Sequence, residues 1–141
     1  MKAEEYKNMV KRYFDALNSK NLDALDELFE KDYVSHENPP RPDGIGVEQF
    51  KKFMSDFYSS YPDGHFTVEE ILVDGNAVVV RWRCDATHTG PTPSLHIPAT
   101  GKKIVIIGCT VEHVRNGKFY DEWGYWDQSA LLEQLGVLSP T

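Results

Sequence analysis

The spacing of apolar and polar positions divides the chain into a helical N-terminal part and a later part made mostly of strands. Residues 6–17 carry apolar side chains in steps of three and one, which predicts a helix with a single apolar stripe. Asn21 then offers a cap for a short helix over residues 22–29. Residues 47–58 place aromatic and apolar side chains on one face and predict a third helix.

The rest of the chain shows the two-residue alternation of β-strands. Residues 66–73 and 77–88 flank an Asp-Gly-Asn sequence that is typical of a hairpin turn. Two longer strands are expected over residues 103–114 and 118–126, and a short helix over residues 130–135. Helices followed by antiparallel strands predict an α+β fold, a cone-shaped roll in which a curved antiparallel sheet wraps around three N-terminal helices. The open end of such a cone is a natural ligand cavity.

Composition limits the classes of partner. The length of 141 residues suits one domain, residues 1–141, with a hydrophobic core. The net charge of -7 argues against nucleic acid and against an anionic membrane surface, because phosphate binding needs clustered Lys and Arg. No apolar run approaches the ~20 residues of a membrane span, and the first residues do not resemble a signal peptide. Cys84 and Cys109 lack the spacing of zinc ligands, so we expect reduced thiols, a cytoplasmic protein and no metal site.

Several short motifs follow one another along the chain in a fixed order. They are Asp32-Tyr33-Val34-Ser35-His36, Tyr61-Pro62, Ala86-Thr87-His88-Thr89-Gly90, Asn116-Gly117-Lys118-Phe119 and Asp121-Glu122-Trp123-Gly124-Tyr125-Trp126-Asp127. With these motifs the chain resembles, over nearly its whole length, the SnoaL-like polyketide cyclases (ester cyclases) of the nuclear-transport-factor-2-like superfamily. The resemblance implies the cone-shaped fold, a small apolar molecule as ligand, no cofactor, and a homodimer formed through the open sheet face.

The resemblance also implies a chemistry. Cyclases of this family close a ring by intramolecular aldol condensation without a metal or cofactor, using an aspartate on the last long strand as acid and base and a histidine on the strand before it. A gap-free alignment on the Asn-Gly-Lys turn places the aspartate at Gly124, the histidine at Thr110, and a position that is Asn in some cyclases at Ser35. Because neither Gly124 nor Thr110 can perform acid–base chemistry, we predict that the protein is not an aldol cyclase of the known kind.

Glu122 is the residue that we expect to act as acid and base in place of the missing aspartate. It lies two residues from Gly124 and therefore on the same face of a regular strand, together with Tyr120 and Trp126. Burial beside these rings would raise the pKa of Glu122 toward the range of an effective acid–base group. Since both faces of the strand carry aromatic residues, a solvent-facing carboxylate is the alternative.

Two further residues are catalytic candidates. His36 stands beside Glu37, and a histidine–carboxylate pair at the cavity edge would act as a proton relay, although a surface histidine is equally consistent with the sequence. Asp127 precedes the last helix, where an N-cap role is the alternative. Ligand-binding positions are expected at Ser35, Trp82, His88, Thr110, Tyr120, Gly124 and Trp126, with core packing as the alternative for Trp82.

Three functions remain open on these observations. The first is a cofactor-independent cyclase-like or isomerase-like enzyme that acts on a small apolar carbonyl or ester compound. The second is a protein that binds such a compound in the same cavity without catalysis, and the third is a dimerisation module. The chain has no nucleophile elbow, P-loop, dinucleotide fingerprint or zinc-protease motif, which excludes the enzyme classes that depend on them.

Overall fold

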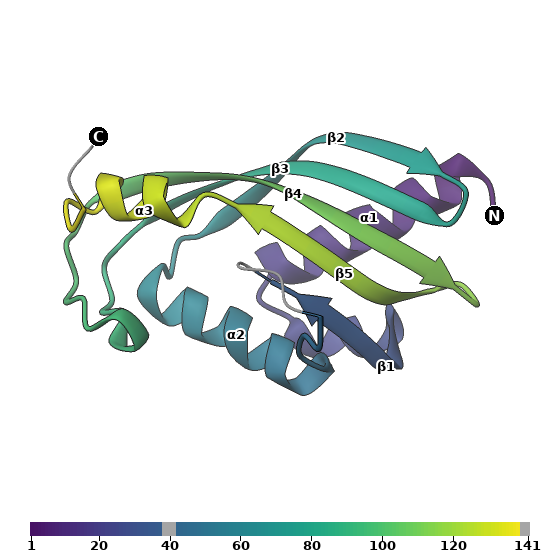
Figure 1. The fold of residues 1–141 in the computed structure, drawn as a ribbon, viewed down its shortest axis with the longest axis horizontal. Helices are drawn as coiled ribbons and strands as arrows, with labels where there is room; N and C mark the ends of the chain where they lie inside the picture. The colour runs from purple at the N-terminus through teal and green to yellow at the C-terminus, as the bar shows by residue number, and fades with distance from the viewer. Residues whose placement is uncertain (38–41, 139–141) are drawn as a thin grey trace.

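A five-stranded sheet bends over two long helices in the computed structural model, which describes residues 1–37 and 42–138 (Figure 1). The Pro-rich sequence at residues 38–41 lies outside the described residues. The elements are α1 (Ala3–Asn18), the 3₁₀ helix η1 (Leu22–Glu27), β1 (Phe29–His36), α2 (Val47–Ser60), β2 (His65–Asp74), β3 (Ala77–Thr87), the 3₁₀ helix η2 (Pro93–Leu95), β4 (Lys103–Arg115), β5 (Lys118–Trp126) and α3 (Gln128–Gln134). The α+β class and the cone-shaped arrangement are confirmed.

The strand order is β1-β5-β4-β3-β2, and β2 to β5 form the expected antiparallel meander. The exception to the antiparallel pattern is β1, which pairs in parallel with β5 at the edge of the sheet. The chain leaves β1 through α2 on the concave side, so no tight turn forces β1 to run against its neighbour. The parallel register places Ser35 of β1 directly beside Glu122 of β5, so these two side chains meet in the functional site.

The second helix differs from the expectation over residues 22–29. Only Leu22–Glu27 are helical, as a 3₁₀ segment, and Phe29 already belongs to β1. Phe29 pairs with Phe119 of β5 and stacks on Tyr33 with ring centroids 3.9 Å apart. Burying the Phe29 ring in the sheet stabilises the fold more than a further turn of helix would. A helix of only six residues is marginal by itself, so it does not compete with the strand for Phe29.

The core lies between the apolar stripe of α1 and the concave face of the sheet. Tyr13 and Phe14 are buried, and their rings contact Phe119 and Phe66 respectively, with centroids 5.8 and 6.1 Å apart. The inward face expected for β3 is also confirmed, since its alternate residues are buried. Cys84 and Cys109 are free thiols. Within residues 1–37 and 42–138, no helix combines the length and the apolar character that a membrane crossing requires.

Candidate functional site

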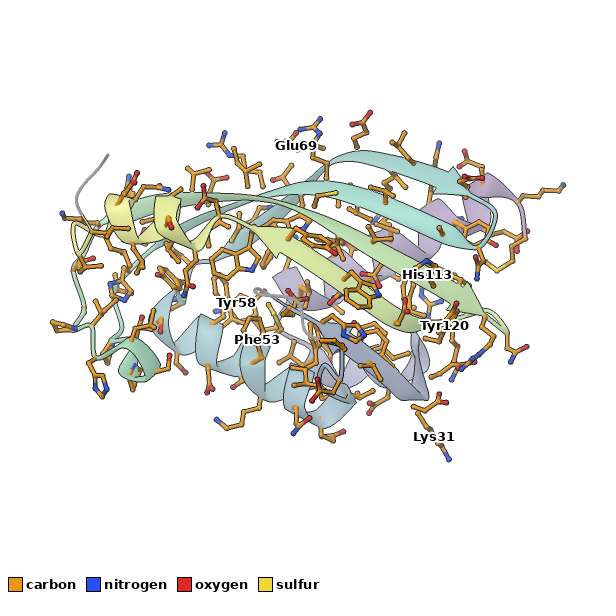
Figure 2. The ribbon with its side chains drawn as sticks, in the orientation of Figure 1. Lys31, Phe53, Tyr58, Glu69, His113 and Tyr120 are labelled. Atoms are coloured by element: carbon orange, nitrogen blue, oxygen red, sulfur yellow. The ribbon has the colours of Figure 1, made fainter. Side chains whose placement is uncertain are left out.

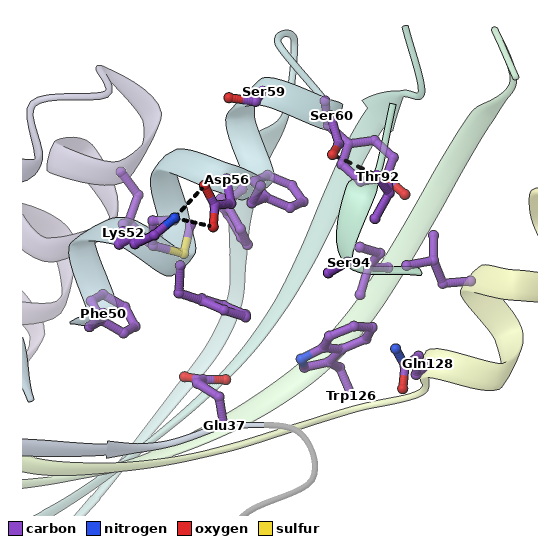
Figure 3. Close-up of a pocket in the computed structure, with 18 of the residues that line it drawn as sticks. Glu37, Phe50, Lys52, Asp56, Ser59, Ser60, Thr92, Ser94, Trp126 and Gln128 are labelled. Atoms are coloured by element: carbon purple, nitrogen blue, oxygen red, sulfur yellow. Dashed lines mark hydrogen bonds and ion pairs between the residues drawn. The ribbon is translucent and has the colours of Figure 1, made fainter. Parts of the chain in front are cut away.

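A cavity of about 740 Å³ opens between α2, the concave face of the sheet and the segment around η2. Its wall is mostly apolar and rich in aromatic rings, among them Phe14, Phe53, Phe57, Phe66, Trp82 and Trp126. Lys52 and Asp56 form an ion pair at 3.0 Å on the α2 side (Figure 3). On the side of the sheet two carboxyl groups, Glu37 and Glu122, enter the wall. An apolar cavity with a few convergent polar groups is typical of a small-molecule site.

Glu122 faces this cavity and not the solvent. It is 2% exposed, and it lies on the inner face of β5 with Gly124. The Tyr13 hydroxyl donates a hydrogen bond of 2.6 Å to Glu122 Oε1, and the Ser35 hydroxyl donates one of 3.1 Å to Oε2. The side chain is therefore held from α1 on one side and from β1 on the other.

Glu37 directly follows β1 and turns inward, as the alternation from Tyr33 and Ser35 requires. Glu37 Oε1 lies 3.3 Å from Ser35 Oγ, whose proton is donated to Glu122, and the Glu37 carboxyl group points into the cavity, with Trp126 to its right in Figure 3. A Cβ atom at Gly124 would overlap the Glu37 carboxyl group. The end of β1 thus supplies a carboxyl group to the space that a side chain at position 124 of β5 would occupy.

Glu112 is a third carboxyl group of the same cluster. It pairs directly with Glu122 across β4 and β5, is 1% exposed, and lies behind Glu122 without lining the cavity. Among the described residues, neither of its oxygens has a hydrogen-bond donor when both carboxyl groups are ionised. Two charged carboxylates facing each other in an apolar interior are strongly unfavourable, and a proton on Glu112 allows it to donate to Glu122.

Burial and mutual repulsion set the charge of the cluster. Burial first, and then the Glu122 charge, raise the pKa of Glu37 and of Glu112 well above the ordinary range. Burial would raise the pKa of Glu122 as well, but the hydrogen bonds from Glu112, Glu37, Tyr13 and Ser35 together outweigh it and lower that pKa. The cluster therefore carries one charge, on Glu122, and holds protons on Glu37 and Glu112.

This ionisation corrects one expectation and defines the chemistry of the site. The sequence predicted a raised pKa for Glu122, whereas the raised pKa belongs to Glu37 and to Glu112. An ionised carboxylate beside a protonated carboxyl group forms a base and an acid in the wall of one cavity. Neighbouring titratable groups whose environments push their pKa values apart are a usual mark of acid–base sites.

Tyr120 is not a neighbour of Glu122, and the prediction of a ligand-binding Tyr120 does not fit the structure. The pairing of β4 and β5 shifts by one residue at Tyr120, which lies in a β-bulge between Phe119 and Asp121. The bulge turns Tyr120 to the outer face, where its ring lies 5.9 Å from that of His113 (Figure 2). Phe119 takes the inner position instead and is fully buried.

His36 and Asp127 also lie outside the cavity wall. His36 is the residue between Ser35 and Glu37, so it points to the opposite face of β1, where it stacks on Trp123 with centroids 3.7 Å apart. Asp127 caps α3, since its carboxylate accepts a hydrogen bond of 3.0 Å from the backbone N–H of Ala130.

The remaining predicted positions are placed as follows. Trp82, Thr110 and Trp126 line the cavity, and the Trp82 indole N–H donates a hydrogen bond of 2.9 Å to the Thr110 hydroxyl. Gly108 stands opposite Trp82 and leaves room for its ring, because a Cβ there would overlap the indole. Gly124 is covered by Glu37, and Ser35 joins Glu37 to Glu122.

His88 is fully buried but holds a loop instead of lining the cavity. The backbone N–H of Thr100 donates to His88 Nδ1 at 3.2 Å, so the other ring nitrogen carries the proton and donates to the Thr92 hydroxyl at 2.9 Å. Thr92 donates in turn to Ser60 at 3.2 Å (Figure 3). Burial lowers the pKa of His88, which favours this neutral form. His88 thus fixes the segment that carries η2 against the end of α2, at the cavity.

Of three further members of the carboxyl cluster, sequence reasoning missed Tyr13 and Glu112, and it considered Glu37 only as the partner of His36. Strand alternation contained a signal for two of them, since Glu37 is two residues from Ser35 and Glu112 is two residues from Thr110. Tyr13 belongs to the expected apolar stripe of α1, where nothing in the spacing distinguishes a hydrogen-bonding hydroxyl from a core ring.

Solved structures of similar fold come from several bacteria. TsrD from Streptomyces laurentii is 23% identical with a TM-score of 0.85, and the match covers 98% of this chain and 99% of that one. AclR from Streptomyces galilaeus, described as a putative hydroxylase, is 22% identical with a TM-score of 0.84, over 99% of this chain and 85% of that one. At these identities the likeness shows the fold alone.

A putative polyketide cyclase, IdmH from Streptomyces antibioticus, is 25% identical with a TM-score of 0.80, over 93% of this chain and 98% of that one. A comparison with curated proteins gives no match. The family model of the SnoaL-like polyketide cyclase matches residues 7–135, which span all five strands, α2 and most of α1. The chain therefore belongs to the SnoaL-like polyketide cyclase family.

Proposed function

We propose that the protein is an acid–base enzyme of the cyclase or isomerase type that acts on a small, largely apolar carbonyl or ester compound in the cone cavity. One observation carries the proposal: the carboxyl group of Glu37 takes the place of the side chain that Gly124 lacks, beside the ionised Glu122. Family membership supports a cyclase-like reaction. The aromatic wall of the cavity supports an apolar substrate.

The two carboxyl groups divide the chemistry between them. Glu122, as base, takes a proton from the carbon next to the substrate carbonyl, while Glu37, as acid, donates its proton to the carbonyl oxygen, giving an enol. For ring closure, the enol carbon attacks a second carbonyl of the same molecule, whose oxygen receives the proton from Glu122. The enol O–H returns its proton to Glu37, which restores both groups. Return of the proton from Glu122 to another carbon of the enol system gives isomerisation instead.

The proposal locates the acid on a different strand from the one that the resemblance implies. The sequence predicted that the chain is not an aldol cyclase of the known kind, because Gly124 and Thr110 have no acid–base function. Glu37 enters the same space from β1, so an aldol-type step needs no carboxyl group at position 124 of β5. An apolar wall also keeps Glu37 protonated, which an acid at neutral pH requires.

Deuterium exchange tests the proposal without knowledge of the natural substrate. Small aromatic ketones such as 1-indanone and 2-tetralone exchange the hydrogens next to the carbonyl in D₂O, and ¹H NMR measures the rate. We expect the protein to accelerate this exchange, and Glu37→Gln or Glu122→Gln to slow it by about 100-fold or more, as is usual for loss of a general acid or base. Glu69→Gln, on the exposed face of β2, is the matched control and leaves the rate unchanged (Figure 2).

Equal rates for the wild type, Glu37→Gln and Glu122→Gln contradict the proposal and favour a protein that binds without catalysis. A transplant tests the location of the acid separately. In the double variant Glu37→Ala/Gly124→Asp the carboxyl group moves from β1 back to β5. We expect exchange to recover to within about tenfold of the wild type, compared with a loss of about 100-fold or more for Glu37→Ala alone.

The proposal keeps two further expectations from the sequence, a two-fold homodimer and a cytoplasmic location. The outer face of the sheet supports the first, since Ile107 and Tyr125 on adjacent strands are 63% and 48% exposed. The free thiols of Cys84 and Cys109 agree with a reducing compartment.

A further inference from the structure

Glu112 is a buried carboxyl group to which the proposed reaction assigns no step. It is 1% exposed and lies on β4 directly behind Glu122, outside the residues that line the cavity. A substrate in the cavity therefore meets Glu122 and Glu37 but not Glu112. A buried acid without a strong ion pair is costly, and an apolar residue of similar size would be favourable there. Its presence calls for a role exerted through Glu122.

We infer, building on the proposed function, that Glu112 is a positioning residue: its protonated carboxyl group donates a hydrogen bond to Glu122 and thereby fixes Glu122 as the base and Glu37 as the acid.

The geometry of Glu122 supports this role. A carboxylate has about four positions at which it accepts hydrogen bonds. The donors from the cavity side are Tyr13, Ser35 and the protonated Glu37, and the fourth donor, Glu112, comes from the neighbouring strand. Before substrate binds, all four donors are in place, so Glu122 binds its own proton weakly and leaves the cavity proton on Glu37. When Glu37 donates to the substrate carbonyl instead, one position on Glu122 becomes free for the proton from carbon.

The other carboxyl groups around Glu112 favour its protonated state. Glu122 on β5 and Glu37 at the end of β1 are carboxyl groups, and Asp121 of β5 adds further repulsion. The hydroxyl groups of Tyr13 on α1 and Tyr33 on β1 also interact with it, and burial and neighbouring charge raise their pKa values too. A proton on Glu112 is therefore the arrangement that the surroundings require, and Glu122 is the acceptor that it faces.

Two substitutions separate a hydrogen-bond donor from a mere filler of space. Glu112→Gln removes the ionisable group but keeps an N–H donor of the same length, so it imitates the protonated acid. Glu112→Met keeps the length and volume but offers no donor, and Glu112→Leu serves as a second apolar variant if the first does not fold. Exchange of buried ionic groups for apolar residues is often well tolerated.

The first readout needs no substrate. In ¹³C NMR titrations of labelled glutamate carboxyl groups, we expect Glu122 of Glu112→Gln to titrate as in the wild type. In Glu112→Met the proton affinity of Glu122 rises about 10- to 100-fold, because a hydrogen bond to a charged group is lost. The second readout is the pH profile of ketone exchange, in which the acid limb of Glu112→Met moves up by about one to two pH units while KM stays unchanged.

Two results overturn the positioning role: Glu122 of Glu112→Met titrating as in the wild type, or Glu112→Gln shifting it as far as Glu112→Met does. The two readouts also separate this inference from the proposed function. A wild type without exchange activity but with the expected titrations refutes the reaction and supports the positioning of the proton. Normal exchange activity in the wild type, together with a Glu122 titration that Glu112→Met leaves unchanged, supports the reaction and refutes the positioning role of Glu112.

Discussion

Replacing Tyr13 with phenylalanine removes one hydroxyl group from the cavity wall and leaves the aromatic ring in place. The ring keeps its contacts with Phe29 and Phe119, whose centroids lie 5.3 and 5.8 Å away. What is lost is the hydrogen bond of 2.6 Å that the hydroxyl donates to Glu122. The substitution therefore tests whether Glu122 is ionised, because the value of that bond depends on the charge of its acceptor.

A hydrogen bond to a charged group contributes about 1.5–3 kcal/mol, against about 1 kcal/mol for a bond between neutral groups. The loss falls on the ionised form of Glu122, so we expect Tyr13→Phe to raise the proton affinity of Glu122 about 10- to 100-fold. The free energy of unfolding at pH 7 falls by about 1.5–3 kcal/mol, and the loss shrinks at acid pH, where Glu122 is protonated. Urea denaturation at several pH values and ¹³C NMR titration measure the two effects.

Tyr58→Phe is the matched control for this substitution. Tyr58 is also buried, and its hydroxyl donates a hydrogen bond of 2.6 Å, but to the backbone carbonyl of Leu17. Its loss lowers stability by about 1 kcal/mol at every pH and leaves the titration of Glu122 unchanged. If Tyr13→Phe behaves in the same way as Tyr58→Phe, Glu122 is not the charged member of the cluster.

Three further predictions concern the cavity wall, the loop and the outer face. Thr110→Val leaves the buried Trp82 N–H without its acceptor and lowers stability by about 1–3 kcal/mol in urea denaturation, without altering the carboxyl titrations. His88 has a lowered pKa in the folded state, so its own contribution to stability is lost as the pH falls below about 6.5, whereas the raised pKa values of Glu37 and Glu112 act in the opposite direction; in urea denaturation the stability of the wild type relative to His88→Gln therefore decreases as the pH falls through this range. Light scattering at micromolar concentration gives a dimer mass for the wild type and a monomer mass for Ile107→Asp; a monomeric wild type contradicts the dimer.

Hydrophobic periodicity predicted the helices and strands because each element buries one side. The stripe of α1 and the alternation of β3 are direct consequences of burial against one core, and both were predicted without error. The 3₁₀ helix η1 was predicted less well. Its leucines have helical spacing, but the pairing of Phe29 with Phe119 in the sheet decides where the strand begins, and this pairing is a long-range contact.

The β-bulge at Tyr120 explains why the site was only partly predictable. A regular hairpin from the turn between β4 and β5 pairs Arg115 with Lys118 and would set Glu112 opposite Asp121. The extra residue shifts the register by one, which sets Glu112 opposite Glu122 and turns Tyr120 outward. No residue type in the sequence marks the bulge, so neither the facing glutamates nor the loss of Tyr120 from the cavity could be read from alternation.

Glu37, by contrast, was within reach of the sequence. Ser35 and His36 are neighbours on one strand and cannot both face the cavity, so placing Ser35 inside required Glu37 inside and His36 outside. What the sequence could not show is the distance between strands that lets Glu37 fill the space above Gly124. That contact depends on the parallel register of β1 with β5.

The carboxyl titration of the wild-type protein tests the central claim most directly. Labelled glutamate resonances followed by ¹³C NMR, and assigned with Glu37→Gln, Glu112→Gln and Glu122→Gln, report the protonation of each group. An exposed glutamate has a pKa of about 4.3. The structure predicts that Glu37 and Glu112 stay protonated well above this pH, whereas Glu122 is already ionised below it. Titration of Glu37 as an ordinary exposed carboxyl group, or loss of its proton before that of Glu122, would contradict the account.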